Sequence, residues 1–243
     1  VVSGGRADVL LTRSLVIATG AFERPLPIPG WTLPGVMTTG AAQTLARSYG
    51  VAPGNRVLIA GNGPLNLQVA AELMRNGVTI AAVAEAAPSP FRRPRAGLRL
   101  AAAHPGLAAA GLAALARLRL AGVPGHFGHV PTQLDGRGRV ERATLVRLRP
   151  DGSIDVDRRI TYDVDAVALG YGFAPANDLA RLLGCRHSMR NGVLEVERDA
   201  LGRSSEPGVL VVGEAGGFGG AHIALAQGTL AGRTVARALG KRA

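Results

Sequence analysis

Turns with small residues at three places in the chain have residue types that let the backbone approach a ligand closely. They are residues 18–20 (Ala-Thr-Gly), residues 61–65 (Gly-Asn-Gly-Pro-Leu) and residues 213–221, which begin with Gly-Glu and end with Gly-Ala. Glycine lets the backbone approach a ligand closely, because no side chain intervenes. A helix that starts after such a turn adds free N–H groups and a positive dipole end, which favour an anion. The turns at residues 61–65 and 213–221 therefore predict nucleotide binding, whereas a strand end with a β-turn is the alternative for residues 18–20.

Residues 56–85 place one of these turns in a recognisable frame. Residues 57–60 are a short apolar run, as expected of a strand covered on both faces. Leu65, Val69 and Leu73 recur every four residues and predict an amphipathic helix that ends near Gly77. A second apolar strand follows over residues 78–84. This is the strand–turn–helix–strand order of a dinucleotide-binding unit.

Two residues refine this prediction. Glu85 lies 24 residues after Gly61, close to the usual spacing of the acid that accepts hydrogen bonds from ribose. Such a carboxylate favours NAD over NADP, whereas Arg92 and Arg93 could accept a 2′-phosphate and leave NADP open. Asn66 stands where the third glycine of the motif is expected, so we expect the helix to sit further out or to tilt. A solvent-exposed Glu at a strand end is the alternative for Glu85.

A last apolar strand over residues 207–213 leads into the third turn, and we expect a helix to open near Ala221. The carboxylate of Glu214 could bind a chain of sugar-like hydroxyls, and a polar loop is the alternative. Gly228 and Gly232 follow Ala224 at four-residue spacing on that helix. Because internal glycines destabilise a helix, this spacing predicts close approach by a neighbouring backbone or a flat cofactor.

We expect these residues to bind a cofactor: Ala18, Thr19, Gly20, Gly61, Asn62, Gly63, Pro64, Leu65, Glu85, Gly172, Gly213, Glu214, Gly220 and Ala221. The catalytic residues stay unassigned, because no nucleophile–base pair stands out. His222 is the one histidine beside a candidate turn, with a structural role as the alternative.

Composition excludes several other classes. The single cysteine, Cys185, excludes an internal disulfide, a CxxC redox pair and a cysteine-ligated cluster held by this chain alone. The histidines are scattered, so no metal site is expected. The net charge of +11 comes from arginines that are not interleaved with aromatic residues, which argues against nucleic-acid binding. No signal peptide or membrane span is visible, and we expect a cytoplasmic protein.

The remaining segments connect these turns. Residues 21–40 are rich in proline and glycine and predict an irregular connector. We expect a helix over residues 40–48 capped by Thr38 or Thr39, a helical region over residues 96–120, and a short helix over residues 177–183 capped by Asn177. Residues 140–148 and 153–156 predict an antiparallel pair joined by a turn at residues 150–152. Residues 162–169 predict another apolar strand, which runs into a turn that contains Gly172.

Four stretches of the sequence carry a family likeness: ATGAFERPLPIPGWTLPGVMTTGAAQ, GNGPLNLQVAAEL, DAVALGYGFAPANDLARLLGC and PGVLVVGEAGGFGGAHIALAQGTLAG. They closely resemble the pyridine nucleotide-disulfide oxidoreductase-like flavoproteins, which have two dinucleotide-binding domains. Within that family they resemble the larger subunits of enzymes of the opine oxidase, hydrogen cyanide synthase and hydroxyproline dehydrogenase type. The likeness spans almost the whole chain, and residues 23–43 are its most specific part.

The resemblance implies an α/β fold with two Rossmann-like domains and a small antiparallel β element. An NAD(P)-type domain, residues 52–169, would be inserted into an incomplete FAD domain made of residues 1–51 and 170–243. Ala18-Thr19-Gly20 would lie near the flavin. Glu214 would correspond to the acid, usually Asp, that holds the FAD ribityl chain. The first glycine motif of the FAD domain would precede residue 1, so we expect a missing upstream part and weak or no FAD binding by this chain.

The function implied is that of an FAD- and NAD(P)-dependent oxidoreductase subunit of an amino-acid or opine-type dehydrogenase or oxidase. Its partners would be a small-molecule substrate or a flavin-bearing subunit in a hetero-oligomer. One alternative is a non-catalytic cofactor-binding or electron-transfer scaffold subunit. Another is a nucleotide-binding protein without a redox role, which would bind ATP or NAD through residues 61–66.

Overall fold

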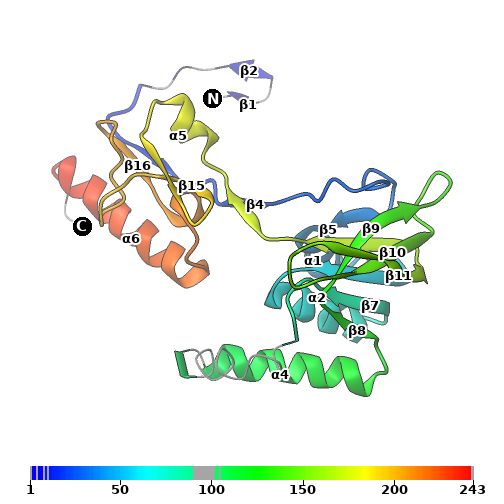
Figure 1. Cartoon of the computed structure of the whole chain (residues 1–243). Coiled ribbons are helices and arrows are strands. Elements are labelled where there is room, and N and C mark those ends of the chain that lie inside the picture. Colours follow the sequence, from blue (N-terminus) through cyan, green and yellow to red (C-terminus); the bar gives the residue numbers. More distant parts are fainter. Residues whose placement is uncertain are drawn as a thin grey trace. The chain divides into compact units, whose positions relative to one another are not determined.

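The computed structural model describes residues 2–3, 5–7, 9, 11–89, 102–103 and 105–241. The chain forms two compact units (Figure 1), one made of Val1–Phe22 with Phe173–Ala243 and the other of Glu23–Gly172. In the described part of the chain, no helix has the length and apolar character needed to cross a bilayer.

The unit Glu23–Gly172 is built on a five-stranded sheet in the order β5-β12-β6-β7-β8. All its strand pairs are parallel. The strands are β5 (Val36–Thr38), β6 (Arg56–Gly61), β7 (Thr79–Glu85), β8 (Gly125–Phe127) and β12 (Ala166–Gly170). Three helices contribute to the core on one face: α1 (Thr39–Tyr49), α2 (Pro64–Arg75) and α4 (Pro105–Leu120). The antiparallel strands β9 (His129–Asp135), β10 (Arg142–Leu148) and β11 (Ile154–Asp163) contribute to the core on the other.

Strand β6 shows why the sheet is buried on both faces. Val57 and Ile59 belong to the core beneath the helices, whereas Leu58 and Ala60 belong to the core beneath the antiparallel strands. Successive side chains of a strand point to opposite faces, so a continuous apolar run is needed here. The predicted strand–turn–helix–strand order of residues 56–85 is confirmed.

The helix predicted over residues 40–48 is confirmed as α1. The Oγ1 of Thr38 caps it by accepting a hydrogen bond from the Ala41 N–H at 3.3 Å. Gly50 ends it in the left-handed region, with φ of 63°. The predicted helical region over residues 96–120 is confirmed over Pro105–Leu120, and residues 96–101 and 104 lie outside the described residues.

Two strand predictions need correction in this unit. The strand predicted over residues 162–169 is divided, because β11 ends at Asp163 and β12 begins at Ala166. Asp165 lies between them, and its carboxylate accepts hydrogen bonds from the N–H groups of Asn55 and Arg56. The strand predicted over residues 153–156 extends to Asp163. The antiparallel pairing of β10 with β11 is confirmed.

The connector predicted over residues 21–40 is partly ordered as strands. Strand β5 pairs in parallel with β12, and its chain continues directly into α1. This pairing holds residues 36–38 in the unit Glu23–Gly172, whereas the predicted NAD(P)-type domain begins at residue 52. The assignment of the two units to FAD and NAD(P) stays a prediction.

The other unit contains smaller sheets. Strands β3 (Leu15–Ile17) and β16 (Val209–Val211) pair in parallel, and β14 (His187–Arg190) and β15 (Val193–Val196) form a hairpin. Strand β4 (Ala21–Glu23) pairs with β13 (Phe173–Pro175). The remaining elements are β1 (Val2–Ser3), β2 (Arg6–Ala7), α5 (Asp178–Leu182), the 3₁₀ turn η2 (Gly213–Gly216) and α6 (Ala221–Ala238). Ile17, Val211 and Ala215 lie in its main core cluster.

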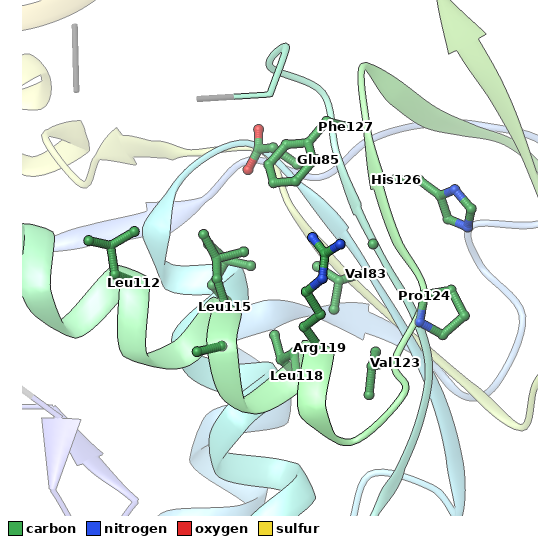
Figure 2. Close-up of a pocket in the computed structure, with 13 residues that line it drawn as sticks. Val83, Glu85, Leu112, Leu115, Leu118, Arg119, Val123, Pro124, His126 and Phe127 are labelled. Carbon is green, nitrogen blue, oxygen red and sulfur yellow. The ribbon is translucent and has the colours of Figure 1, made fainter. Parts of the chain in front are cut away.

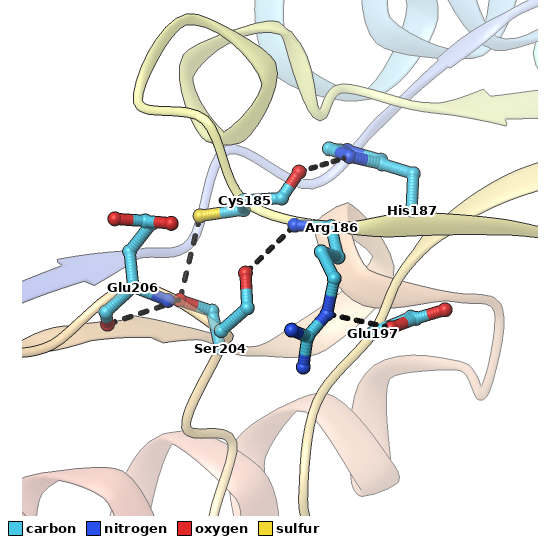
Figure 3. A network of polar contacts seen from close by, with 7 residues as sticks. Cys185, Arg186, His187, Glu197, Ser204 and Glu206 are labelled. Carbon is cyan, nitrogen blue, oxygen red and sulfur yellow. Dashed lines mark hydrogen bonds and ion pairs between the residues drawn. The ribbon is translucent and has the colours of Figure 1, made fainter.

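The lone cysteine is part of a polar network in this unit (Figure 3). The Cys185 thiol donates to the Ser204 Oγ at 3.4 Å, and the same oxygen accepts from the Glu206 N–H at 3.1 Å. The Arg186 Nε donates to a Glu197 carboxylate oxygen at 3.3 Å. Cys185 is buried, and its hydrogen bond to Ser204 joins the segment before β14 to the segment before β16.

Two predictions for this unit differ in part from the structure, although Asn177 stands at the N-cap position of α5 as predicted. The Asn177 side chain does not cap α5, because its Nδ2 donates instead to the Leu194 carbonyl at 2.8 Å. Gly228 and Gly232 were expected to meet a neighbouring backbone or a flat cofactor. Among the described residues no backbone lies within 4 Å of a Cβ at either position outside the helix itself, and the cofactor alternative stays a prediction. Helix α6 packs through Ala231 against Leu210 and Val212, which leaves these glycines on its open side.

Candidate functional site

The carboxyl edge of the parallel sheet collects the predicted nucleotide-binding residues of the unit Glu23–Gly172. Gly61 pairs in register with Gly170 on one side and with Glu85 on the other. The chain then turns through Asn62 and Gly63 into α2, with Pro64 as its first residue. In open α/β sheets this edge is where ligands bind. The structure therefore brings Gly61, Gly63 and Glu85 together.

The Glu85 carboxylate is bound to the turn itself. One oxygen accepts a hydrogen bond from the Gly63 N–H at 2.9 Å, and the other accepts from the Ala87 N–H at 2.9 Å. The side chain is buried, and this burial raises the pKa of Glu85, while the two hydrogen bonds oppose the rise. The sequence predicted that N–H groups of this turn and of the helix start bind phosphate, and one of them, the Gly63 N–H, donates to Glu85 instead.

Other donors remain at the start of α2. The Asn62 N–H donates to the Gly170 carbonyl at 2.8 Å, and Pro64 has no N–H. The N–H groups of Leu65 and Asn66 lie in the first helical turn, where the helix supplies no acceptor. Together with the positive helix end, these two N–H groups are suited to an anion.

Asn66 is the feature of this site that sequence reasoning explained least. Its side chain is 2% exposed, its Oδ1 accepts from the Thr39 hydroxyl at 2.8 Å, and its Nδ2 donates to the Gly170 carbonyl at 3.1 Å. A Cβ on Gly61 would lie 2.0 Å from the Gly170 carbonyl oxygen, and one on Gly170 would lie 2.2 Å from Asn66 Oδ1. The glycines opposite make room for the amide. The predicted tilt of α2 stays a prediction.

A tyrosine completes this edge. Tyr171 follows Gly170, and its hydroxyl is buried without a hydrogen-bond partner among the described residues. Burial first, and then the Glu85 carboxylate, raise the pKa of Tyr171, so that it stays a neutral donor.

A largely apolar cavity of about 700 Å³ lies beside Glu85. Its lining includes Val83, Leu112, Leu115, Val123 and Phe127, and Figure 2 shows Glu85 and Phe127 near each other at one end of it. His126 also lines it, and burial, followed by His129, lowers the pKa of His126. Sequence reasoning missed this cavity, although the apolar composition of residues 105–120 was a signal for it.

The second set of predicted residues lies in the unit Val1–Phe22 with Phe173–Ala243. Strands β3 and β16 are parallel, and the Val212 N–H donates to the Ile17 carbonyl at 2.9 Å. Ala18 and Gly213 therefore leave the same edge of this pair. The Thr19 hydroxyl donates to the Ala176 carbonyl, and the Ala176 N–H donates to the Gly20 carbonyl at 2.9 Å. These bonds fix the Ala-Thr-Gly turn.

The glycine loop after β16 is held by two side chains that sequence reasoning did not identify. Gln227 Oε1 accepts from the Gly213 N–H at 2.8 Å and from Arg198 at 3.1 Å, and Arg198 also donates to the Val211 carbonyl at 2.9 Å. Burial lowers the pKa of Arg198, and the negative charge of Glu195 opposes this fall. Glu214 is half-buried at the start of this loop.

Some predicted residues lie apart from these sets. Gly220 and Ala221 lie at the start of α6, after the 3₁₀ turn, and His222 beside them is exposed. Gly172 ends the other unit, where its carbonyl accepts from the Arg24 N–H at 2.9 Å. Arg92 and Arg93 lie outside the described residues.

Comparison with known proteins identifies the family. The family model "Pyridine nucleotide-disulphide oxidoreductase" matches residues 2–228. The chain belongs to this family. The hydrogen cyanide synthase subunit HcnB of Pseudomonas aeruginosa is 36% identical over 218 residues, which are 89% of this chain and 47% of that protein. An opine oxidase subunit of Rhizobium meliloti is 37% identical over 238 residues, 94% of this chain and 49% of that protein. The chain thus spans about half the length of these relatives.

Solved structures of the family share the fold. An FAD-dependent pyridine nucleotide-disulphide oxidoreductase from Desulfovibrio vulgaris has a TM-score of 0.69 at 21% identity, and covers 96% of this chain and 56% of its own. An NAD-dependent persulfide reductase from A. fulgidus has a TM-score of 0.68 at 20% identity, and covers 100% of this chain and 42% of its own. The predictions of family and of α/β fold class are confirmed, and the FAD and NAD(P) predictions agree with this membership.

Proposed function

We propose that the chain is the dinucleotide-binding part of a flavin-dependent oxidoreductase subunit, and that the unit Glu23–Gly172 holds a dinucleotide of the NAD(P) type. The observation that carries the proposal is the carboxyl edge of the parallel sheet, where Gly61, Glu85 and the start of α2 converge. Family membership supports redox chemistry. When bound, a nicotinamide or flavin cofactor would supply hydride or electron transfer, and the protein would bind and orient it.

The residues at this edge fit the parts of a dinucleotide. The N–H groups of Leu65 and Asn66 would donate to phosphate oxygens at the positive end of α2. Glu85 would accept hydrogen bonds from ribose hydroxyls through the lone pairs that Gly63 and Ala87 leave free. The apolar cavity next to Glu85 is suited to a planar ring.

In the other unit, Ala18-Thr19-Gly20 and Gly213-Glu214 would hold part of an FAD. They leave one edge of a parallel strand pair, and the half-buried Glu214 offers a carboxylate to a hydroxyl chain. The proposed substrate class is a small amine or amino acid, because two relatives are named as subunits of hydrogen cyanide synthase and opine oxidase. The same names support a hetero-oligomer with a second subunit.

A scaffold subunit for cofactor binding or electron transfer is the second candidate. The hydrogen bonds of Glu85, at the carboxyl edge of the parallel sheet, favour this candidate. Both its carboxylate oxygens accept backbone N–H groups, and this arrangement suits binding more than proton transfer.

Calorimetric titration with NAD⁺ and NADH tests the proposal. We expect the wild-type chain to bind, and Gly63→Trp to abolish binding, because an indole would fill the space over the turn. Gly138→Trp is the matched control, since both glycines have positive φ (114° and 75°) and open space around a Cβ. Absence of binding by the wild type, or equal binding by Gly63→Trp, would refute the proposed dinucleotide site. NADH oxidation with a dye acceptor by this chain alone would refute the scaffold candidate.

A further inference from the structure

An arginine-lined groove of about 770 Å³ lies in the unit Glu23–Gly172, and none of residues 61–65 lines it. Three segments form it: the loop that follows Glu85, the turn between β8 and β9, and the β10–β11 hairpin. Its lining includes Ala86, Phe127, His129, Leu148 and Ile160. Neither the family likeness nor the proposed dinucleotide site assigns a role to this groove.

Four arginines line this space. Arg147 and Arg149 come from β10 and its end, and Arg158 and Arg159 come from β11. The lining contains no Asp or Glu among the described residues. Asp155 pairs with Arg149 at 3.3 Å, whereas Arg147 and Arg158 have no ion-pair partner in the part of the chain that the structure describes. The groove is therefore a site of unbalanced positive charge.

An irregularity in the hairpin places two of these arginines. Val146 pairs with Arg159, but the next residue, Arg147, pairs with Asp155. Residues 156–158 thus have no partner in register on β10. Such bulges redirect side chains and are common beside binding sites. Arg159 is held in place because its Nε donates to the Val156 carbonyl at 2.9 Å, which leaves its terminal NH₂ groups available.

The size and the floor of the groove indicate what kind of anion it would take. Phe127, Leu148 and Ile160 give it an apolar floor, and its volume lies in the range of small-molecule sites, about 300–1,000 Å³. Arginine forks bind phosphate oxygens in pairs. We propose that this groove binds a small phosphorylated organic anion through Arg147, Arg149, Arg158 and Arg159, independently of the glycine turn at residues 61–65.

Calorimetric titration with inorganic pyrophosphate at low ionic strength tests the proposal. We expect the wild type to bind and the double variant Arg147→Gln/Arg158→Gln to bind at least about tenfold more weakly, because two paired contacts are lost. Arg139→Gln/Arg142→Gln is the matched control: it removes the same charge from the β9–β10 connection and the start of β10, outside the groove. The control should bind within about twofold of the wild type. Equal thermal unfolding curves would show that each variant is folded.

Four outcomes would overturn the proposal. If the wild type does not bind pyrophosphate, the groove is not a site for such an anion. If the control loses as much affinity as the groove variant, the binding reflects only general charge attraction. If Gly63→Trp abolishes pyrophosphate binding, the anion binds at the glycine turn and the groove is not a separate site. If a short polyglutamate peptide binds the groove more tightly than pyrophosphate does, the ligand is an acidic protein segment and not a small phosphorylated anion.

Discussion

The two candidate cofactor regions use different means to hold a glycine-rich turn. In the unit Glu23–Gly172, the turn follows the middle of a five-stranded parallel sheet, and Glu85 and Asn66 fill the space around it. In the other unit, the corresponding turn follows a two-stranded parallel pair, and Gln227 and Arg198 hold it. The first turn is fixed by a sheet packed on both faces, whereas the second depends on one pair of side chains. We therefore expect the first region to be the more rigid.

The largest expected effect is steric and falls on the first region. Gly61→Ala should lower the free energy of unfolding by at least about 3 kcal/mol, the upper range for overpacking, because its Cβ would lie 2.0 Å from the Gly170 carbonyl oxygen. Gly213→Ala should lower it by about 1–2 kcal/mol, the penalty of a left-handed backbone, since its nearest contact is 3.4 Å. Urea unfolding measures both. Equal destabilisation by the two substitutions would contradict the proposed difference between the two regions.

The next effect tests the polar partners of the two turns. Gln227→Leu should lower the free energy of unfolding by about 2 kcal/mol, because Gly213 N–H and Arg198 lose their shared acceptor. Asn66→Leu should lower it by a similar amount through the Thr39 hydroxyl and the Gly170 carbonyl. The rates at which the Gly213 and Gly63 amide protons exchange with solvent distinguish the effects of the two substitutions. Gln227→Leu should speed exchange at Gly213 alone, and faster exchange at both amides would contradict independent turns.

A smaller effect concerns pH in the first region. Burial raises the pKa of Glu85 in the folded state. As pH rises, the Glu85 carboxyl therefore loses its proton at a lower pH in the unfolded chain than in the folded one. The contribution of Glu85 to stability is then present below its usual pKa, about 4.3, and is lost as pH rises through the higher folded value. Relative to Glu85→Gln, the wild type should lose stability between pH 4 and neutral pH. Urea unfolding across this range checks it, and a difference that grows in the opposite sense would contradict the burial argument.

The smallest effect tests the open side of α6. Gly228→Ala and Gly232→Ala should each raise the free energy of unfolding by about 0.5–1 kcal/mol, because alanine favours the helix and a Cβ there meets open space. Thermal unfolding of the isolated chain measures this. Destabilisation by either substitution would mean that something packs closely on this side, as the sequence suggested.

The first region was the more predictable from sequence. The apolar run of β6, the four-residue spacing in α2 and the strand before Glu85 are local patterns, and they predicted the elements correctly. The polar contacts around the turn could not be predicted, because they join residues far apart in sequence: Asn66 with Gly170, and Thr39 with Asn66. The strand predicted over residues 162–169 failed for a related reason. Asp165 divides it by accepting N–H groups of residues 55 and 56.

The second region was predicted mainly through its glycines. Glycine spacing alone does not show which side of a helix is packed, so it did not exclude the neighbouring backbone that the described residues lack beside Gly228 and Gly232. Arg198 and Gln227 carry no local signal, because each acts on a backbone group that folding brings to it. Nothing local showed that Asn177 would bind the Leu194 carbonyl and not cap its helix.

The central claim is that the unit Glu23–Gly172 holds a dinucleotide at the carboxyl edge of its parallel sheet. Its most direct test is the set of backbone amide NMR shifts of the chain during titration with NAD⁺. We predict that the amide signals of Leu65, Asn66 and Ala87 move in a saturable way, while those of residues 213–217 do not. Shifts confined to residues 213–221, or no shifts at saturating NAD⁺, would contradict the claim.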